Sequence, residues 1–595
     1  MKLSRLLLIS AVLVSLTSCD DLFEPALENN QDISEMYKDP TFARGILDNA
    51  YLALPYSNSP STDAATDDAV INQNGDDYKK MATGSWAANM NPVSQWDGRY
   101  HAIQYCNLML ENCDKVEWSY SSKVLNKMYA DNYKGNAYAL RGLHLFYLLR
   151  AHAGMVDGQL MGVPLHLASE TSSSDFNLPR NTFKECIDQI ISDFDEALKY
   201  LPEQYGDVDE DKVPAKYAQE GASNAEYNRA FGSIHRGKID GRIISAFKAQ
   251  VAIMAASPAY ASAGTFTYED AAKLAADCLK KFGGLTACDP DGWKWFNNKS
   301  VIDKLGATTD NPKEIIWRGA IDENNSLEGD NYPPSLYGKG RINPTQNLVD
   351  AFPMANGYPV ADKANSGYSE NAPYTGRDPR LEKYILFNGA EFKDKTIITG
   401  LYPDEDNKQD NGLNQLNTST RTGYYMRKLL REDCNANPNS LNAKYHIPVR
   451  IRYTEIFLAY AEAANDAWGP TGKGGNAYSA YDVIKAIRVR GGVGTDNGDA
   501  YLESVKGDKD KMAQLIRNER RIELCFENKR FWDIRRWKMP LDEKAKGMQI
   551  EKAGESLNYK VIEVENRNYK DYMYYGPIPY SEMLKWSNLQ QNKGW

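Results

Sequence analysis

The side chains that most often carry out catalysis or hold metals are scattered along this sequence of 595 residues. The six histidines are dispersed, and His144 and His152 lie eight residues apart, about 12 Å along a helix, which is too far to share a metal. No metalloprotease, serine-hydrolase, phosphate-binding or paired-cysteine motif occurs. The segment 207–211 begins like a calcium loop, but Lys212 replaces the turn glycine and Ala218 replaces the bidentate glutamate. We therefore expect no enzyme, no cofactor and no metal, and the sequence does not support a structural calcium ion.

The loop-rich block 55–92 combines acidic side chains with a flat aromatic ring. Asp67 and Asp68 precede Trp86, which lies in a Gly- and Ser-containing stretch without helical or strand periodicity. An exposed ring flanked by carboxylates can stack on the apolar face of a ligand and bind its polar rim. Trp86, with Asp67 and Asp68, is therefore the preferred candidate for ligand binding.

A second loop-rich block, from about 285 to 447, contains further aromatic and basic candidates. Tyr332 and Arg377 are the ligand contacts that we select there, because loops carry binding residues more often than regular elements do. For any one of the candidates in this block, packing in the core is an equal alternative, since Trp and Tyr are often highly buried. The other candidates are Trp293, Trp295 and Tyr337.

Charge and cysteine content restrict the class of protein. The chain has 70 basic and 80 acidic residues, a formal charge of -10, which disfavours nucleic acid as a partner because phosphates attract net positive surfaces. Apart from Cys19, the seven cysteines occur singly in apolar contexts, so we expect no disulfide framework. Beyond the N-terminus, no apolar run reaches the roughly 20 residues of a transmembrane helix.

The N-terminus has the layout of a secretory signal peptide: Lys2 and Arg5, then an apolar run from 6 to 14. Leu16-Thr17-Ser18 directly before Cys19 resembles the lipobox of bacterial lipoproteins, in which the chain is cut before the cysteine and the cysteine is acylated. We expect a signal peptide at 1–18 and a lipidated acidic linker at 19–34. The alternative is a plain signal peptide followed by a chance cysteine.

The elements that must position the candidate residues are paired helices. Apolar residues at three- and four-residue spacing, interleaved with Ala and Gly, predict helices that pack closely on other helices. The predicted pairs are 41–54 with 98–115, 132–153 with 181–200, 241–259 with 267–282, and 453–468 with 477–490, and a last helix covers 509–526. They resemble tetratricopeptide units only loosely. The predicted parts are 35–284, helical; 285–447, irregular and loop-rich; and 448–595, helical again.

The C-terminal segment 516–537, IRNERRIELCFENKRFWDIRRW, resembles the hallmark of the SusD/RagB family of outer-membrane nutrient-binding lipoproteins. Further similar stretches occur in family order over nearly the whole mature chain. They are 141–150 leading to Gly162-Val163-Pro164-Leu165, 344–352, 378–381, 423–428, 452–463, and Pro577-Ile578-Pro579 before the terminal Gly594-Trp595.

The resemblance implies an all-α dominated fold of four tetratricopeptide-like helix pairs, with an irregular loop-rich insertion that carries short β-hairpins and ligand contacts. It also implies a lipid-anchored protein of the outer membrane that faces the cell exterior and covers a SusC-like TonB-dependent β-barrel transporter. The implied ligand is an oligosaccharide, captured without being altered. Two alternatives stay open: a lid of the same kind that binds peptides, and a non-catalytic helical-repeat scaffold for surface glycan-degrading enzymes.

The same C-terminal segment has a structural interpretation from its residues alone. Acidic side chains alternate with basic ones at helix-pair spacings, which a nucleic-acid-binding stripe would lack. We expect a partly buried ion-pair network that fastens the last helix to the helical array, with Trp532 and Trp537 as packing anchors. Its members are Arg517, Glu519, Arg520, Arg521, Glu523, Glu527, Lys529, Arg530, Asp533, Arg535 and Arg536.

Overall fold

The computed structural model describes residues 33–595. The predicted signal peptide, the acylated Cys19 and most of the predicted linker lie outside these residues and stay predictions. Within 33–595, no helix combines the length and the apolar character that crossing a bilayer requires.

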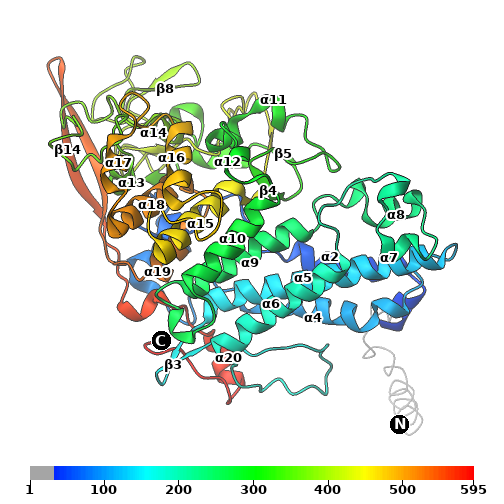
Figure 1. Ribbon diagram of the computed structural model, residues 1–595. Helices are drawn as coiled ribbons and strands as arrows, with labels where there is room; N and C mark the ends of the chain where they lie inside the picture. The colour runs from blue at the N-terminus through cyan, green and yellow to red at the C-terminus, as the bar shows by residue number, and fades with distance from the viewer. Residues whose placement is uncertain (1–32) are drawn as a thin grey trace, which may run out of the picture.

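The four predicted helix pairs are present (Figure 1). Each pair packs side by side, and neighbouring pairs pack on one another through α4 with α5 and α10 with α15. The fold is therefore the predicted one, dominated by helices. The pairs are α2 (Pro40–Leu52) with α4 (Trp96–Asn112), α5 (Lys123–His152) with α6 (Phe183–Tyr200), α9 (Gly241–Ala256) with α10 (Tyr268–Lys280), and α15 (Tyr453–Trp468) with α16 (Ala480–Arg490).

Local sequence signals set where the second helix of three pairs begins. Thr182, Thr267 and Ser479 each form a capping box at the start of α6, α10 and α16. In this motif, side chains satisfy backbone N–H groups that the first helical turn leaves without partners. Small residues then allow close packing: a Cβ atom added at Gly135 of α5 would lie 2.7 Å from Leu201, just after α6.

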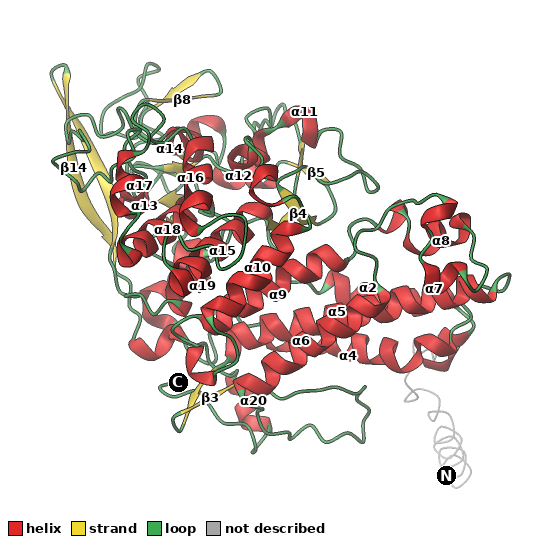
Figure 2. Ribbon diagram, viewed as in Figure 1, coloured by secondary structure: helices red, strands yellow, loops and turns green. Residues whose placement is uncertain are grey.

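The irregular region is attached to the helices by short antiparallel strand pairs (Figure 2). Strand β4 (Ile315–Arg318) pairs with β12 (Val449–Arg452), which leads directly into α15. Strand β5 (Asp322–Asn324) pairs with β11 (Lys444–His446), and β6 (Ile342–Pro344) pairs with β1 (Ala69–Ile71) of the first loop block. These pairings bring the two loop-rich blocks together although they are far apart in sequence.

The longest strands, β13 (Ala545–Ala553) and β14 (Ser556–Glu565), form a hairpin that sequence analysis did not identify. Figure 1 shows it at the edge of the molecule. No residue of β14 is buried. Its Leu557 and Tyr559 pack against the core while only partly buried, so the face of β14 is weaker than that of a strand with one fully buried side.

The predicted ion-pair network is present and buried around α18 (Lys509–Glu523) and α19 (Arg530–Arg536). The Glu523 carboxylate has no exposed surface and lies 2.9 Å from both Arg380 and Arg490 and 3.8 Å from Arg452. Trp537 is a packing anchor, as predicted, and donates a hydrogen bond to Glu462 over 2.8 Å. The network therefore joins the last helices to α14 (Pro379–Tyr384), α15 and α16.

Replacing Glu523 by Gln should lower the free energy of unfolding by about 3–5 kcal/mol, because it removes the buried carboxylate that Arg380, Arg452 and Arg490 share and leaves each with fewer counter-ions. Urea unfolding at neutral pH measures this difference. Glu563→Gln is the matched control, since its side chain is 66% exposed in its pair with Lys544 and exposed pairs contribute about 0.2–1 kcal/mol. Equal losses in the two variants would contradict the proposed role of the network.

The network also predicts acid sensitivity. Burial opposes ionisation of Glu523, but Arg490, Arg380 and Arg452 outweigh it and lower its pKa to about 2. Burial is likewise outweighed at Glu527, where Arg452 and Lys428 lower the pKa to about 2. Since unfolded glutamate titrates near pH 4.3, this stabilisation should be complete above about pH 5 and lost as the pH falls toward about 2. Urea unfolding across this range should show a shallower pH dependence for Glu523→Gln than for the unaltered protein; identical slopes would contradict the prediction.

Candidate functional site

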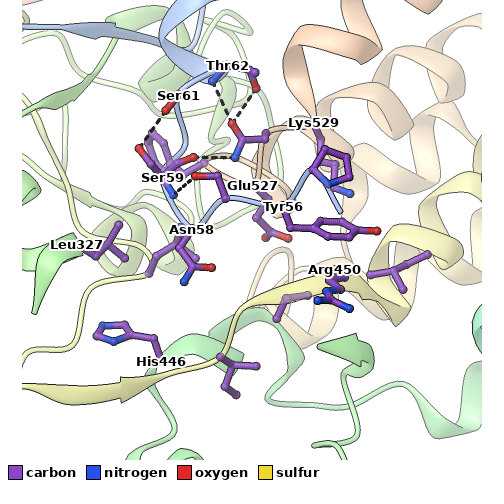
Figure 3. A pocket seen from close by; sticks show the side chains of 18 of the residues that line it. Tyr56, Asn58, Ser59, Ser61, Thr62, Leu327, His446, Arg450, Glu527 and Lys529 are labelled. Atoms are coloured by element: carbon purple, nitrogen blue, oxygen red, sulfur yellow. Dashed lines mark hydrogen bonds between the residues drawn. The ribbon is translucent and has the colours of Figure 1, made fainter. Parts of the chain in front are cut away.

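The candidate site is a cavity of about 490 Å³ between the helical stack and the irregular region (Figure 3). Its walls come from the loop 55–62, the segment 92–95 before α4, the end of α5, helix α9, residues 295–296, the segment 322–331, strand β12 and the segment 526–532. The lining therefore combines segments from three separate parts of the chain. The side chains that line it include Tyr56, Tyr147, Arg150, Gln250, Trp295, His446, Arg450, Arg452, Glu455, Glu527, Lys529 and Trp532.

The loop 55–62 is fixed by a single asparagine from the C-terminal segment. Asn528 accepts hydrogen bonds from the backbone N–H and hydroxyl of Thr62 over 3.0 and 2.8 Å, and donates one to the Ser59 carbonyl over 2.9 Å. Its φ of 58° lies in the left-handed region, which asparagine tolerates better than most residues. The backbone N–H of Asn528 also donates to Asp63, whose pKa is raised to about 8 by burial and by the neighbouring Asp68.

Two guanidinium groups pack on aromatic rings at one wall of the cavity, and one of these rings, Trp317, is buried behind the wall. Arg450 lies 5.2 Å from the ring centre of Tyr56 and 4.4 Å from that of Trp317, and Figure 3 shows Tyr56 and Arg450 side by side. The Tyr56 hydroxyl is hydrogen-bonded to the Tyr147 hydroxyl over 2.6 Å. Contacts between a cation and a ring face orient the guanidinium and leave its N–H edge free for other partners.

The row continues with Arg150 at the end of α5. Its guanidinium carbon lies 4.9 Å from the ring centre of Tyr147 and 4.3 Å from that of Trp532. Trp532 therefore lines the cavity in addition to packing against Phe531, which is more than the anchoring role predicted from the sequence. We refer to Trp532, Arg150, Tyr147, Tyr56, Arg450 and Trp317 as the arginine–aromatic row.

Three cavity residues carry buried hydrogen-bond donors that have no acceptor within residues 33–595. They are Nε of Arg150, Nε2 of Gln250 on α9, and Nε1 of Trp295. A buried donor without an acceptor costs about 1–3 kcal/mol. The cavity is therefore built to receive hydrogen-bond acceptors.

The described residues contain one group that could hold a metal, at the edge of this cavity. One ligand atom each of Glu328, Cys434 and His446 lie within 4.8 Å of one another. Glu328 already accepts hydrogen bonds from His446 over 2.9 Å and from the backbone N–H of Arg431 over 2.7 Å. Burial and the neighbouring Glu328 raise the pKa of Cys434 to about 12, so its thiol stays protonated. The group is held by its own hydrogen bonds, and it is not the oxygen-rich set that calcium prefers.

The structure places Trp86, the preferred candidate from the sequence, in the core. Its side chain is 4% exposed and packs against Trp595, Phe531 and Tyr569 at ring distances of 4.8, 5.9 and 5.9 Å. The guanidinium of Arg535 lies 5.1 Å from the ring centre. The assignment of Trp86 as a binding platform is therefore corrected, because protein side chains already cover its ring.

The two acidic candidates are also structural. Asp67 and Asp68 are buried and contact Arg521 at 2.8 and 2.6 Å, and Asp67 also contacts Arg530 at 2.8 Å. They belong to the buried ion-pair network and do not line the cavity. Both carboxylates are already paired with guanidinium groups and are buried away from the cavity, so neither is available to a ligand.

Tyr332 and Arg377 have the packing role that we gave as the alternative. Tyr332 has no exposed surface, and its hydroxyl donates to the carbonyl of Arg431 over 2.5 Å. Arg377 is 7% exposed and donates to backbone carbonyls, of Pro373 over 2.8 Å and of Phe352 over 2.7 Å among others. Neither lines the cavity. Of the loop aromatics that sequence analysis named, Trp295 does.

Sequence analysis did not single out Tyr56, Arg150, Gln250 or Arg450. Arg150 ends the 141–150 motif and Arg450 lies two residues before the 452–463 motif, so both adjoin segments that were recognised for other reasons. Tyr56 lies in the loop block that was selected, outside the chosen residues. The only feature of the sequence that could have pointed to Arg150 and Arg450 is their position at or beside a recognised motif. Such a position does not distinguish a residue that lines a cavity from one on the outer surface.

Two family models match this chain. The model described as the SusD family matches residues 313–595, and the model described as starch-binding associating with outer membrane matches residues 27–221. Together they include the cavity segments 55–62, 322–331 and 526–532, whereas Gln250 and Trp295 lie between the two matched ranges.

The chain is also similar to SusD-like proteins in sequence and in fold. A SusD-like protein of Formosa agariphila is 22% identical over 454 residues, which cover 75% of this chain and 73% of the relative. The crystal structure of a SusD-like protein from Bacteroides fragilis has a TM-score of 0.69 at 23% identity and covers 96% of this chain and 100% of its own. A second structure from Bacteroides fragilis, of a SusD-like carbohydrate-binding protein, has a TM-score of 0.67 at 20% identity, covering 93% and 100%.

The burial of Trp86 predicts a structural phenotype. Trp86→Ala should lower the free energy of unfolding by about 3–5 kcal/mol, because it leaves a cavity among large aromatic side chains. The control is Trp586→Ala, whose ring is half-buried and stacks on Phe176, itself 37% exposed, so a smaller loss is expected. Urea unfolding compares the two variants. A Trp86 variant as stable as the unaltered protein would show that the ring is free to bind a ligand.

Proposed function

Because this chain belongs to the SusD/RagB family, we propose that it is a surface-exposed, lipid-anchored protein of the outer membrane that captures oligosaccharides and delivers them to a SusC-like TonB-dependent transporter. Capture is non-covalent, and the chain is not an enzyme. Acylated Cys19 is the anchor in this proposal, and the linker to residue 34 holds the folded part away from the lipid.

The observation that carries the proposal is the composition of the cavity. A sugar ring has an apolar C–H face and a rim of hydroxyl groups, so its binding site needs flat apolar surface next to donors and acceptors. The cavity provides the rings of Tyr56, Trp295 and Trp532 beside the free donors of Arg150 and Gln250. A volume of about 490 Å³ lies within the range of small-molecule sites, about 300–1,000 Å³. The similar carbohydrate-binding structure from Bacteroides fragilis supports this choice of ligand class.

A peptide-binding lid of the same architecture is the second candidate. One observation favours it: Arg150 and Arg450 already cover faces of Tyr147, Trp532 and Tyr56, which reduces the ring surface open to a sugar. Asparagine side chains such as Asn58 and Asn331 also line the cavity and can bind a peptide backbone.

Titration calorimetry of the purified mature protein with fructan, glucan, mannan and uronate oligosaccharides and with peptides tests the proposal. We expect binding of one glycan class, and Gln250→Ala should weaken it about threefold to tenfold because a hydrogen bond to the ligand is lost.

Gln219→Ala is the matched control, since Gln219 is exposed beside α7 (Ala215–Ala218) and does not line the cavity. Its affinity should equal that of the unaltered protein. Binding of peptides alone would support the second candidate. Failure of every oligosaccharide to bind, with the transporter still co-purifying, would favour a scaffold.

A further inference from the structure

We propose that the captured glycan is acidic, and that Arg150 and Arg450 bind its carboxylate or sulfate groups. This inference rests on the proposed function and specifies the ligand class of the same cavity. The two guanidinium groups differ from the other cations of the cavity wall in having no counter-ion.

The other cations of the wall are paired within the protein. Lys529 contacts Glu455 at 2.9 Å, and Arg452 contacts Glu527 at 2.9 Å. By contrast, neither Arg150 nor Arg450 has a carboxylate within 4.0 Å or a hydrogen-bond acceptor in the part of the chain from 33 to 595. They contact the rings of the arginine–aromatic row, and Arg150 also contacts the ring of Phe146.

The carboxylates that face the cavity do not neutralise these two guanidiniums. Glu455 and Glu527 are held by the cations just named, and Asp330 contacts Lys339 at 2.9 Å. Asp322 is exposed and accepts a hydrogen bond from Asn324 over 2.8 Å, without a cation within 4.0 Å. Two unpaired positive charges therefore face one unpaired negative charge at the rim, which leaves an excess that an anionic ligand can balance.

The geometry of the free donors also suits an anion. Because rings cover the guanidinium faces, the N–H edges remain for binding, and a guanidinium edge matches a carboxylate or sulfate with two parallel hydrogen bonds. Nε of Arg150 and the donors of Gln250 and Trp295, which line the same cavity, have no acceptor in the described chain. A carboxylate or sulfate is acceptor-only, so it satisfies such donors without adding an unpaired donor of its own.

Burial supports the same conclusion. It lowers the pKa of both Arg150 and Arg450, which reflects the cost of keeping charge away from water. Nearby tyrosines only partly offset this effect at both residues, and Glu455 acts on Arg150 from beyond pairing distance. An anionic group between the arginines would remove this cost and would be attracted more strongly than by an exposed pair.

The test uses matched pairs of ligands. Oligomers of galacturonate, alginate and glucuronoxylan are compared by calorimetry with their carboxyl-reduced counterparts, and carrageenan and chondroitin oligosaccharides with their desulfated counterparts. We expect at least one acidic member to bind about tenfold or more tightly than its neutral partner, since charged hydrogen bonds are lost on reduction. The two sets distinguish carboxylate from sulfate. The advantage should shrink between about 50 and about 500 mM NaCl, as screening predicts.

Arg450→Gln should remove most of the preference for the acidic member. Arg229→Gln is the matched control, because Arg229 is exposed on α8 (Asn224–Phe231), outside the cavity, and it should keep the full preference. The ligand comparison needs no variant, so it decides the question even if Arg450→Gln folds poorly. Neutral oligosaccharides that bind as tightly as every acidic partner would overturn this inference and leave the proposed function standing. Failure of all oligosaccharides, charged and neutral, would overturn both.

Discussion

The pairing of buried charge at the carboxyl end of α18 is the interaction on which the rest of the structure depends. Glu523 lies within 4 Å of arginines from α14, from the start of α15 and from the end of α16. These segments come from the irregular region and from the last helix pair. A buried carboxylate that loses its partners is strongly destabilising, so the three segments are held in one relative position. Because Arg452 and Glu527 of the network also line the cavity, the network fixes the position of these cavity walls as well.

The network and the cavity share residues. Arg452 and Glu527 line the cavity and also pair with one another at 2.9 Å, and Lys428 contacts Glu527 at 2.7 Å. The protein thus uses its local carboxylates to neutralise its own cations. Arg150 and Arg450 are left with aromatic partners, which orient a guanidinium without neutralising it. The same pairing that stabilises the fold therefore determines which charges remain available to a ligand.

The aromatic residues of the loops also fall into two groups: some fill the core and others line the cavity. Trp86 and Tyr332 fill the interior of loop-rich segments, where little regular structure exists to bury apolar surface. A long loop can be ordered only if large side chains and hydrogen bonds offset its conformational entropy. Tyr56 and Trp532 remain at the cavity wall, where arginine side chains cover part of their rings. An aromatic residue in a loop can therefore stabilise the loop by packing in the core, and its presence in a loop does not by itself indicate a ligand contact.

The sequence by itself determined the four helix pairs and the alternating charges that form the buried network, because helical periodicity, capping residues and charge spacing are local properties of the chain. Its motifs, above all 516–537, carry the resemblance to the SusD/RagB family. Only the tertiary structure decided which side chains face the cavity. Trp86 and Asp67 stand in a segment that resembles a binding loop, yet both are covered by residues more than 400 positions away, Trp595 and Arg530. Arg150 and Arg450 lie in ordinary helix and strand sequence, and they stand out only because no carboxylate lies within 4.0 Å of either guanidinium. Exposure and pairing depend on long-range contacts, which residue spacing along the chain does not encode.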